Sequence, residues 1–83
     1  MLKKEEKIKL KDYQKRMVEE YKELNTKIDK LTIFLSKEDI QKEITATQIT
    51  LMKSQLFSMM SYSSILLLRL QLEEDIPTIE YEP

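Results

Sequence analysis

The feature that most constrains this chain is an apolar residue at every third or fourth position over two long stretches. The first stretch has a 4-3-4-3-4 spacing and consists of Met17, Tyr21, Leu24, Ile28, Leu31 and Leu35. The second has similar spacing and consists of Ile49, Met52, Leu56, Met59, Leu66 and Leu70. Residues at these spacings share one face of an α-helix. The pattern therefore predicts an all-α helical hairpin of two long helices.

Composition argues against most alternatives to a helical fold. The chain has no glycine, which disfavours phosphate-binding loops, tight β-turns and most sheets. It has no cysteine, so disulfides and thiolate zinc sites are excluded. It also lacks histidine, the commonest general base and metal ligand. We therefore expect a protein that is not an enzyme and needs no cofactor or metal.

The predicted helix ends follow from capping residues. We expect a first long helix over 9–35, with residues 1–11 as its frayed or extended start. Ser36 to Asp39 fits a capping box and predicts a short intervening helix over about 37–44. Thr45 or Thr47 can cap the second long helix, over about 48–74. Residues 1–76 then form a single hairpin domain, and 77–83 form an acidic tail that is flexible unless a partner orders it.

The end of the second long helix is apolar around much of its circumference. Leucine or isoleucine occupies positions 65–68, 70 and 72. A helix that is apolar on most sides is buried on most sides, and a two-layer hairpin of 83 residues offers little cover. We therefore predict that the chain assembles into a homo-oligomeric helical bundle, with Leu66, Leu67 and Leu70 at the interface between subunits.

The charge distribution is uneven. Residues 1–35 carry ten Lys or Arg and seven Asp or Glu, whereas residues 36–83 carry four and eight. This asymmetry favours head-to-tail pairing, although solvated helix faces explain it more simply. We do not expect nucleic acid as a partner, because acidic residues are interleaved with the N-terminal lysines. No apolar run is long enough for a membrane span or a signal peptide, so we expect a cytoplasmic protein.

The most site-like cluster lies near the start of the first long helix. It contains Tyr13, Gln14 and Arg16. Tyrosine can stack on a base, and arginine can hold a phosphate. The simpler interpretation is that Tyr13 extends the apolar seam and the cations are solvated. Farther along the chain, Arg69 is the single cation in the leucine-rich run, where it needs either an acidic partner or a ligand phosphate.

Two groups of phage proteins resemble this chain. The pattern Asp12-Tyr13-Gln14-x-Arg16-x-Val18-x-Glu20, followed by Leu24, Ile28, Leu31 and Phe34-Leu35, resembles small phage proteins related to a crAss-like phage protein. The resemblance continues through Gln55-Leu56, Met59, Tyr62, Ile65-Leu66 and Arg69. More distantly, the chain is similar to the hairpin domain of phage anti-CBASS and anti-Thoeris proteins. Those proteins form helical homo-oligomers and sequester cyclic nucleotide immune signals in pockets between subunits.

The resemblance implies a phage counter-defence protein of the host cytoplasm that binds a cyclic di- or oligonucleotide without catalysis. Tyr13 corresponds to a ligand-binding tyrosine of the similar hairpins and would stack on a base. Arg16, Lys27 and Arg69 would meet phosphates, although Lys27 takes this role only with a one-residue shift in register. Two alternatives stay open: a protein-binding inhibitor of a bacterial defence effector, similar to anti-CRISPR proteins, and a helical structural or adaptor oligomer.

Overall fold

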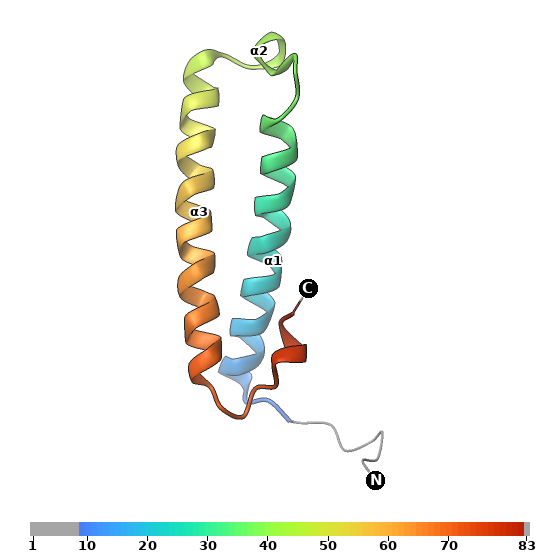
Figure 1. Ribbon diagram of the computed structural model, residues 1–83, viewed down its shortest axis with the longest axis vertical. Coiled ribbons are helices and arrows are strands. Elements are labelled where there is room, and N and C mark those ends of the chain that lie inside the picture. The colour runs from blue at the N-terminus through green and yellow to red at the C-terminus, as the bar shows by residue number, and fades with distance from the viewer. Residues whose placement is uncertain (1–8, 83) are drawn as a thin grey trace.

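The computed structural model describes residues 9–82 of the chain. Its elements are α1 (Asp12–Leu35), α2 (Ile40–Glu43), α3 (Ala46–Leu72) and the short 3-10 helix η1 (Thr78–Glu80). Helices α1 and α3 run antiparallel side by side, and α2 lies in the connection between them (Figure 1). The predicted all-α hairpin is therefore confirmed. The start expected at residues 1–8 lies outside the described residues.

The observed helix ends confirm one predicted cap and correct another. The Thr45 side-chain oxygen accepts a hydrogen bond from the Gln48 backbone N–H at 3.1 Å, so α3 begins at Ala46. Ser36, by contrast, is not an N-cap. It ends α1, where its hydroxyl donates to the Ile33 carbonyl oxygen at 2.7 Å. The serine thus satisfies a carbonyl of the finished helix, and α2 starts only after Asp39.

The core lies at the end of the hairpin where α1 begins and α3 ends. Its buried apolar side chains are Met17, Val18, Leu24, Leu66, Leu70, Ile76 and Tyr81. Leu66 and Leu70 are 0% exposed, and Leu67 is partly buried against them. These leucines were predicted to contact another subunit. For Leu66 and Leu70 that assignment needs correction, because α1 and the C-terminal tail already cover them within one chain.

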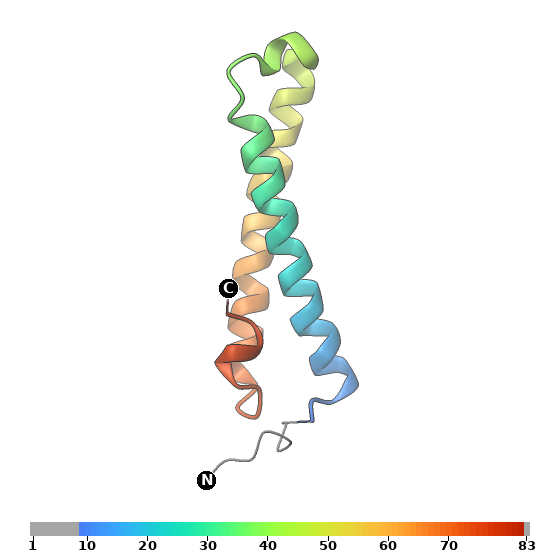
Figure 2. The same cartoon turned by 90° about the vertical axis from the view of Figure 1, so that its right-hand side faces the viewer.

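The C-terminal tail folds back along the hairpin. Figure 1 shows η1 beside the first half of α1, and Figure 2 shows it in front of the last turns of α3. Tyr81 is 7% exposed, and its ring meets Tyr21 edge-on, with centroids 6.2 Å apart and an interplanar angle of 86°. The expectation of a free tail is therefore wrong through residue 82. Ile76 and Tyr81 supply apolar cover that the two helices alone lack.

The molecule is nevertheless elongated. Its Cα radius of gyration is 17.2 Å, whereas a compact chain of this length would have about 12 Å. Several large apolar side chains stay exposed, including Phe57, Leu68 and Leu72 on α3. Within residues 9–82, no helix has both the length and the apolar character that crossing a membrane requires.

Candidate functional site

The predicted ligand residues are divided between two regions of the hairpin. Tyr13 and Arg69 line a groove of about 270 Å³ together with Met17, Leu72 and Glu73. Lys27 lies fourteen positions after Tyr13 on α1, roughly 21 Å along the helix axis. Arg16 is exposed and does not line this groove. One chain therefore brings Tyr13 and Arg69 together but separates both from Lys27.

Tyr13 and Gln14 attach the end of α3 to the start of α1. The Tyr13 hydroxyl donates to Glu73 Oε1 at 2.7 Å. The Gln14 side-chain amide donates to Glu73 Oε1 at 2.9 Å and to Asp75 Oδ1 at 3.0 Å. Its oxygen accepts from the Lys11 backbone N–H at 2.8 Å. Gln14 is 1% exposed with its polar groups engaged, so its observed role is structural.

These contacts shift two pKa values in opposite directions. The hydrogen bond to Glu73 raises the pKa of Tyr13, because the carboxylate favours the neutral phenol. The pKa of Glu73 is lowered, first by the Tyr13 hydrogen bond and then by that from Gln14. Both shifts favour the observed pair of a neutral phenol and a charged carboxylate. The Tyr13 hydroxyl is therefore not free for a ligand, although the ring is still partly exposed.

A second groove, which we call the lysine groove, lies between α1 and α3 toward the α2 end. Its volume is about 450 Å³, and its lining residues are Lys27, Lys30, Leu31, Phe34, Met52, Gln55 and Met59. The two lysines and Phe34 come from α1 at spacings of three and four, which places them on one side of that helix. Gln55 adds an amide from α3. The groove thus combines two cations, an aromatic ring and an amide with an apolar floor.

The lysine groove has the charge pattern of an anion site. No carboxylate among the residues that the structure describes lines it. Within residues 9–82, the only ion pairs are Lys37–Glu43 and Lys42–Asp39, both near α2, so neither lysine of the groove is paired. Lys37 also lies over the Phe34 ring, with its Nζ 5.0 Å from the centroid. An anionic ligand here would therefore meet cations that no described carboxylate neutralises.

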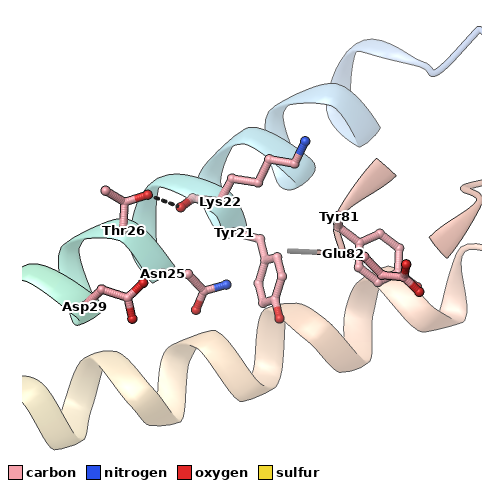
Figure 3. A pocket seen from close by; sticks show the side chains of 7 residues that line it. All are labelled: Tyr21, Lys22, Asn25, Thr26, Asp29, Tyr81 and Glu82. Atoms are coloured by element: carbon pink, nitrogen blue, oxygen red, sulfur yellow. Dashed lines mark hydrogen bonds between the residues drawn. The ribbon is translucent and has the colours of Figure 1, made fainter. Parts of the chain in front are cut away.

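A third groove, the tyrosine groove, lies where the tail meets α1 (Figure 3). Its volume is about 500 Å³, and its lining residues are Tyr21, Lys22, Asn25, Thr26, Asp29, Tyr81 and Glu82. Asn25 accepts a 2.7 Å hydrogen bond from Ser63 of α3, which fixes the two helices relative to each other. Two carboxylates and a single lysine line this groove, so it suits a phosphate-bearing ligand less well than the lysine groove does.

Sequence reasoning identified Lys27 but not its neighbours. Lys30 and Phe34 follow it at positions i+3 and i+7, a spacing that places all three on the same side of a helix. That signal was present in the sequence. The contribution of Gln55 depends on the register between α1 and α3, which no local pattern specifies.

Comparison with known proteins gives one match. No curated protein and no solved structure matches the chain. The family model described as Sequestin matches residues 11–72, which span α1, α2 and α3. The matched segment contains every residue that lines the lysine groove but ends before the C-terminal tail. Because the match extends over well more than half of the sequence, the chain belongs to the Sequestin family.

Proposed function

We propose that this protein is a phage counter-defence protein that binds and sequesters a cyclic di- or oligonucleotide immune signal without chemically changing it. The family name indicates a sequestering protein. The observation that carries the choice of ligand is the lysine groove, where Lys27 and Lys30 stand without carboxylate partners among the described residues. The resemblance to phage hairpins that bind cyclic nucleotides supports the same choice.

The chemistry of the groove fits the parts of such a ligand. Lysine ammonium groups donate charge-assisted hydrogen bonds to phosphate oxygens. The apolar side chains of Leu31, Met52 and Met59 can contact the flat face of a base, and the Gln55 amide can pair with its polar edge. In this arrangement Lys27 keeps its predicted role, whereas Tyr13 and Gln14 stabilise the fold.

Calorimetric titration tests the proposal. The wild-type protein is titrated with a panel of cyclic di- and trinucleotides and cyclic ADP-ribose species. We expect at least one to bind at micromolar concentration or tighter. Lys27→Ala and Lys30→Ala should each weaken binding about tenfold or more, because a hydrogen bond to a charged group contributes about 1.5–3 kcal/mol and 1.4 kcal/mol corresponds to a factor of ten.

Lys15→Ala is the matched control. Lys15 is an exposed lysine of the same helix that lines none of the three grooves described above. Its removal changes the net charge as Lys27→Ala does, so it should alter affinity only slightly. Equal losses for Lys15→Ala and Lys27→Ala would indicate non-specific attraction. If no member of the panel binds, the cyclic-nucleotide proposal is wrong.

A second candidate function is inhibition of a bacterial defence effector by protein binding. The observation that favours it is the apolar surface exposed on α3, where Phe57, Leu68 and Leu72 face outward. Exposed patches of this kind commonly mark protein-binding surfaces. This candidate requires the surface to be free in the assembled protein.

A further inference from the structure

Helix α3 has a second seam, made of apolar and hydroxyl-bearing side chains, on the side that faces away from α1. We call it the outer seam; its residues are Thr50, Ser54, Phe57, Ser61, Ile65, Leu68 and Leu72. The spacing is 4-3-4-4-3-4, as in helices that pack lengthwise against another helix. Each of these residues is exposed in the single chain. In Figure 1, no other described element lies on this side of α3.

The outer seam is uncharged over most of its length. No residue between Lys53 and Arg69 carries a charge. The outward side of α1 is different, with exposed Glu19, Glu23 and Lys30. A charged helix packed on the outer seam would lose its hydration without gaining a counter-charge. The best match for this surface within the described chain is therefore the outer seam of another copy.

We propose that two copies pair through the outer seam as a symmetric antiparallel dimer centred on Ser61. In this register Ser54 lies opposite Leu68 and Thr50 opposite Leu72, while Phe57 lies opposite Ile65 and Ser61 opposite itself. Each small side chain at one end of the seam then faces a large one at the other. A parallel pairing would put leucine against leucine at one end and serine against serine at the other, which leaves a gap.

The exposed area is sufficient for such a contact. Four large apolar side chains of the seam are between 55% and 79% exposed. With side chains of this size on the order of 150–200 Å² each, they leave about 500 Å² of apolar surface. The serines, Leu51 and Met60 add to it. Standard interfaces begin at about 600 Å² per partner, so the seam reaches the lower end of the stable class.

The pairing would also complete the lysine groove, a consequence that rests on the proposed function. Arg69 lies on the same flank of the outer seam as Leu51 and Gln55. A two-fold axis perpendicular to both helices puts the same flank of each copy on one side of the dimer. Arg69 of the second copy therefore lies level with position 53, beside Gln55 at the rim of the groove. The predicted ligand residues Lys27 and Arg69 would meet between copies.

Disulfide trapping tests the register, because the chain has no cysteine of its own. Ser61→Cys places a thiol on the two-fold axis, and mild oxidation should give a covalent dimer on a non-reducing gel. Ser54→Cys is the matched control. It changes the same residue type on the same seam, but its two copies would lie roughly 21 Å apart along the axis. By itself, the Ser54→Cys variant should run as a monomer on the gel. Mixed with the Leu68→Cys variant, it should form a covalent dimer.

Each other outcome contradicts the proposal. Equal cross-linking of Ser54→Cys and Ser61→Cys would show a parallel pairing. No cross-linking of any variant, together with a wild-type mass of one 10.0 kDa chain by light scattering, would show that the seam does not bind a second copy. In that case the surface would be left for a host protein.

Charge insertion provides a second test that needs no ligand. Leu68→Glu should reduce the molecular mass in solution from that of two chains to that of one. Helical content should be retained, because Leu68 lies outside the core. Ile79→Glu is the control, since Ile79 is similarly exposed but lies on η1. If Leu68→Glu unfolds the chain, Ser61→Glu replaces it at an exposed position on the axis. A dimer that survives both substitutions would refute the interface.

The contribution of Arg69 to ligand binding is tested separately. Arg69→Ala should weaken cyclic-nucleotide binding at least fivefold and leave the dimer mass unchanged. If Arg69→Ala binds the ligand with normal affinity, Arg69 is not part of the ligand site, but the proposed interface is unaffected. Absence of any ligand would reject the proposed function, whereas the cross-linking result would still stand.

Discussion

The two ends of this hairpin are built from the same kind of apolar seam but differ in how well they bury it. At the end that includes the tail, Met17, Leu66 and Leu70 are buried. Toward α2, the seam residues Leu31, Met52 and Leu56 are only partly buried, and Ile40 is the single buried side chain of residues 28–60. The difference lies in the cover, since the tail supplies a third layer at one end only.

This contrast connects packing with the proposed function. Two helices in contact leave a furrow on each side, and a third segment can fill it. Near Tyr21, the furrow is covered by Tyr81. Lys27 lies on the opposite flank of α1 from Asn25, and on that flank no described segment covers the furrow, which forms the lysine groove. A hairpin can thus keep one end as a stable core while the other end stays open for a ligand.

The largest expected effect is the loss of a core leucine. Leu66→Ala should lower the free energy of unfolding by about 2–5 kcal/mol, because it removes a fully buried side chain and leaves a cavity. Leu56→Ala makes the same chemical change in the half-buried seam and should cost on the order of 1 kcal/mol. Urea denaturation at fixed protein concentration, followed by helical circular dichroism, gives both values. Equal losses would mean that the two ends are equally well packed.

The tail is the next test of the comparison. Tyr81→Ala should lower stability by about 1.5–3 kcal/mol, as expected for a largely buried side chain. The cost is limited because the tail can detach while the hairpin stays folded. Hydrogen exchange should then show faster exchange at Ile76 to Glu82, with little change around α2. Unchanged exchange in the tail would contradict its role as a third layer.

Periodicity predicted the helices and their contacting faces because both depend on local spacing. Thr45 was also predictable, since an N-cap needs only neighbouring backbone. Ser36 was not, because the same hydroxyl can bond the helix before it or the helix after it. The roles of Tyr13 and Gln14 depend on Glu73, about sixty residues away. Tail docking and groove composition likewise depend on helix register, which a single sequence leaves open.

Smaller effects are expected from Ser36 and Thr45, which cap the end of α1 and the start of α3 on either side of α2. Thr45→Ala should cost about 1 kcal/mol, because it removes the acceptor for the Gln48 N–H at the start of α3. Ser36→Ala should cost less, since Ser36 only adds a donor to a carbonyl at the exposed end of α1. Thermal unfolding of the two variants measures the difference. A larger loss of stability for Ser36→Ala than for Thr45→Ala would indicate that Ser36 acts as an N-cap.

The smallest expected effect concerns the pH dependence of the Tyr13–Glu73 contact. The pKa of Glu73 is lowered from 4.5, so its contribution to stability is present above pH 4.5 and lost as the pH falls toward its folded value. The pKa of Tyr13 is raised from 10.0, so its contribution is present below pH 10.0 and lost as the pH rises through its folded value. The stability difference between wild type and Tyr13→Phe should therefore be constant near neutrality and shrink at both extremes.

Tyr62→Phe is the control, because Tyr62 is 41% exposed, close to the 43% of Tyr13, but makes no described side-chain hydrogen bond. If the Tyr13→Phe difference changes with pH no more than the Tyr62→Phe difference does, the contact does not hold the end of α3 against α1 in solution.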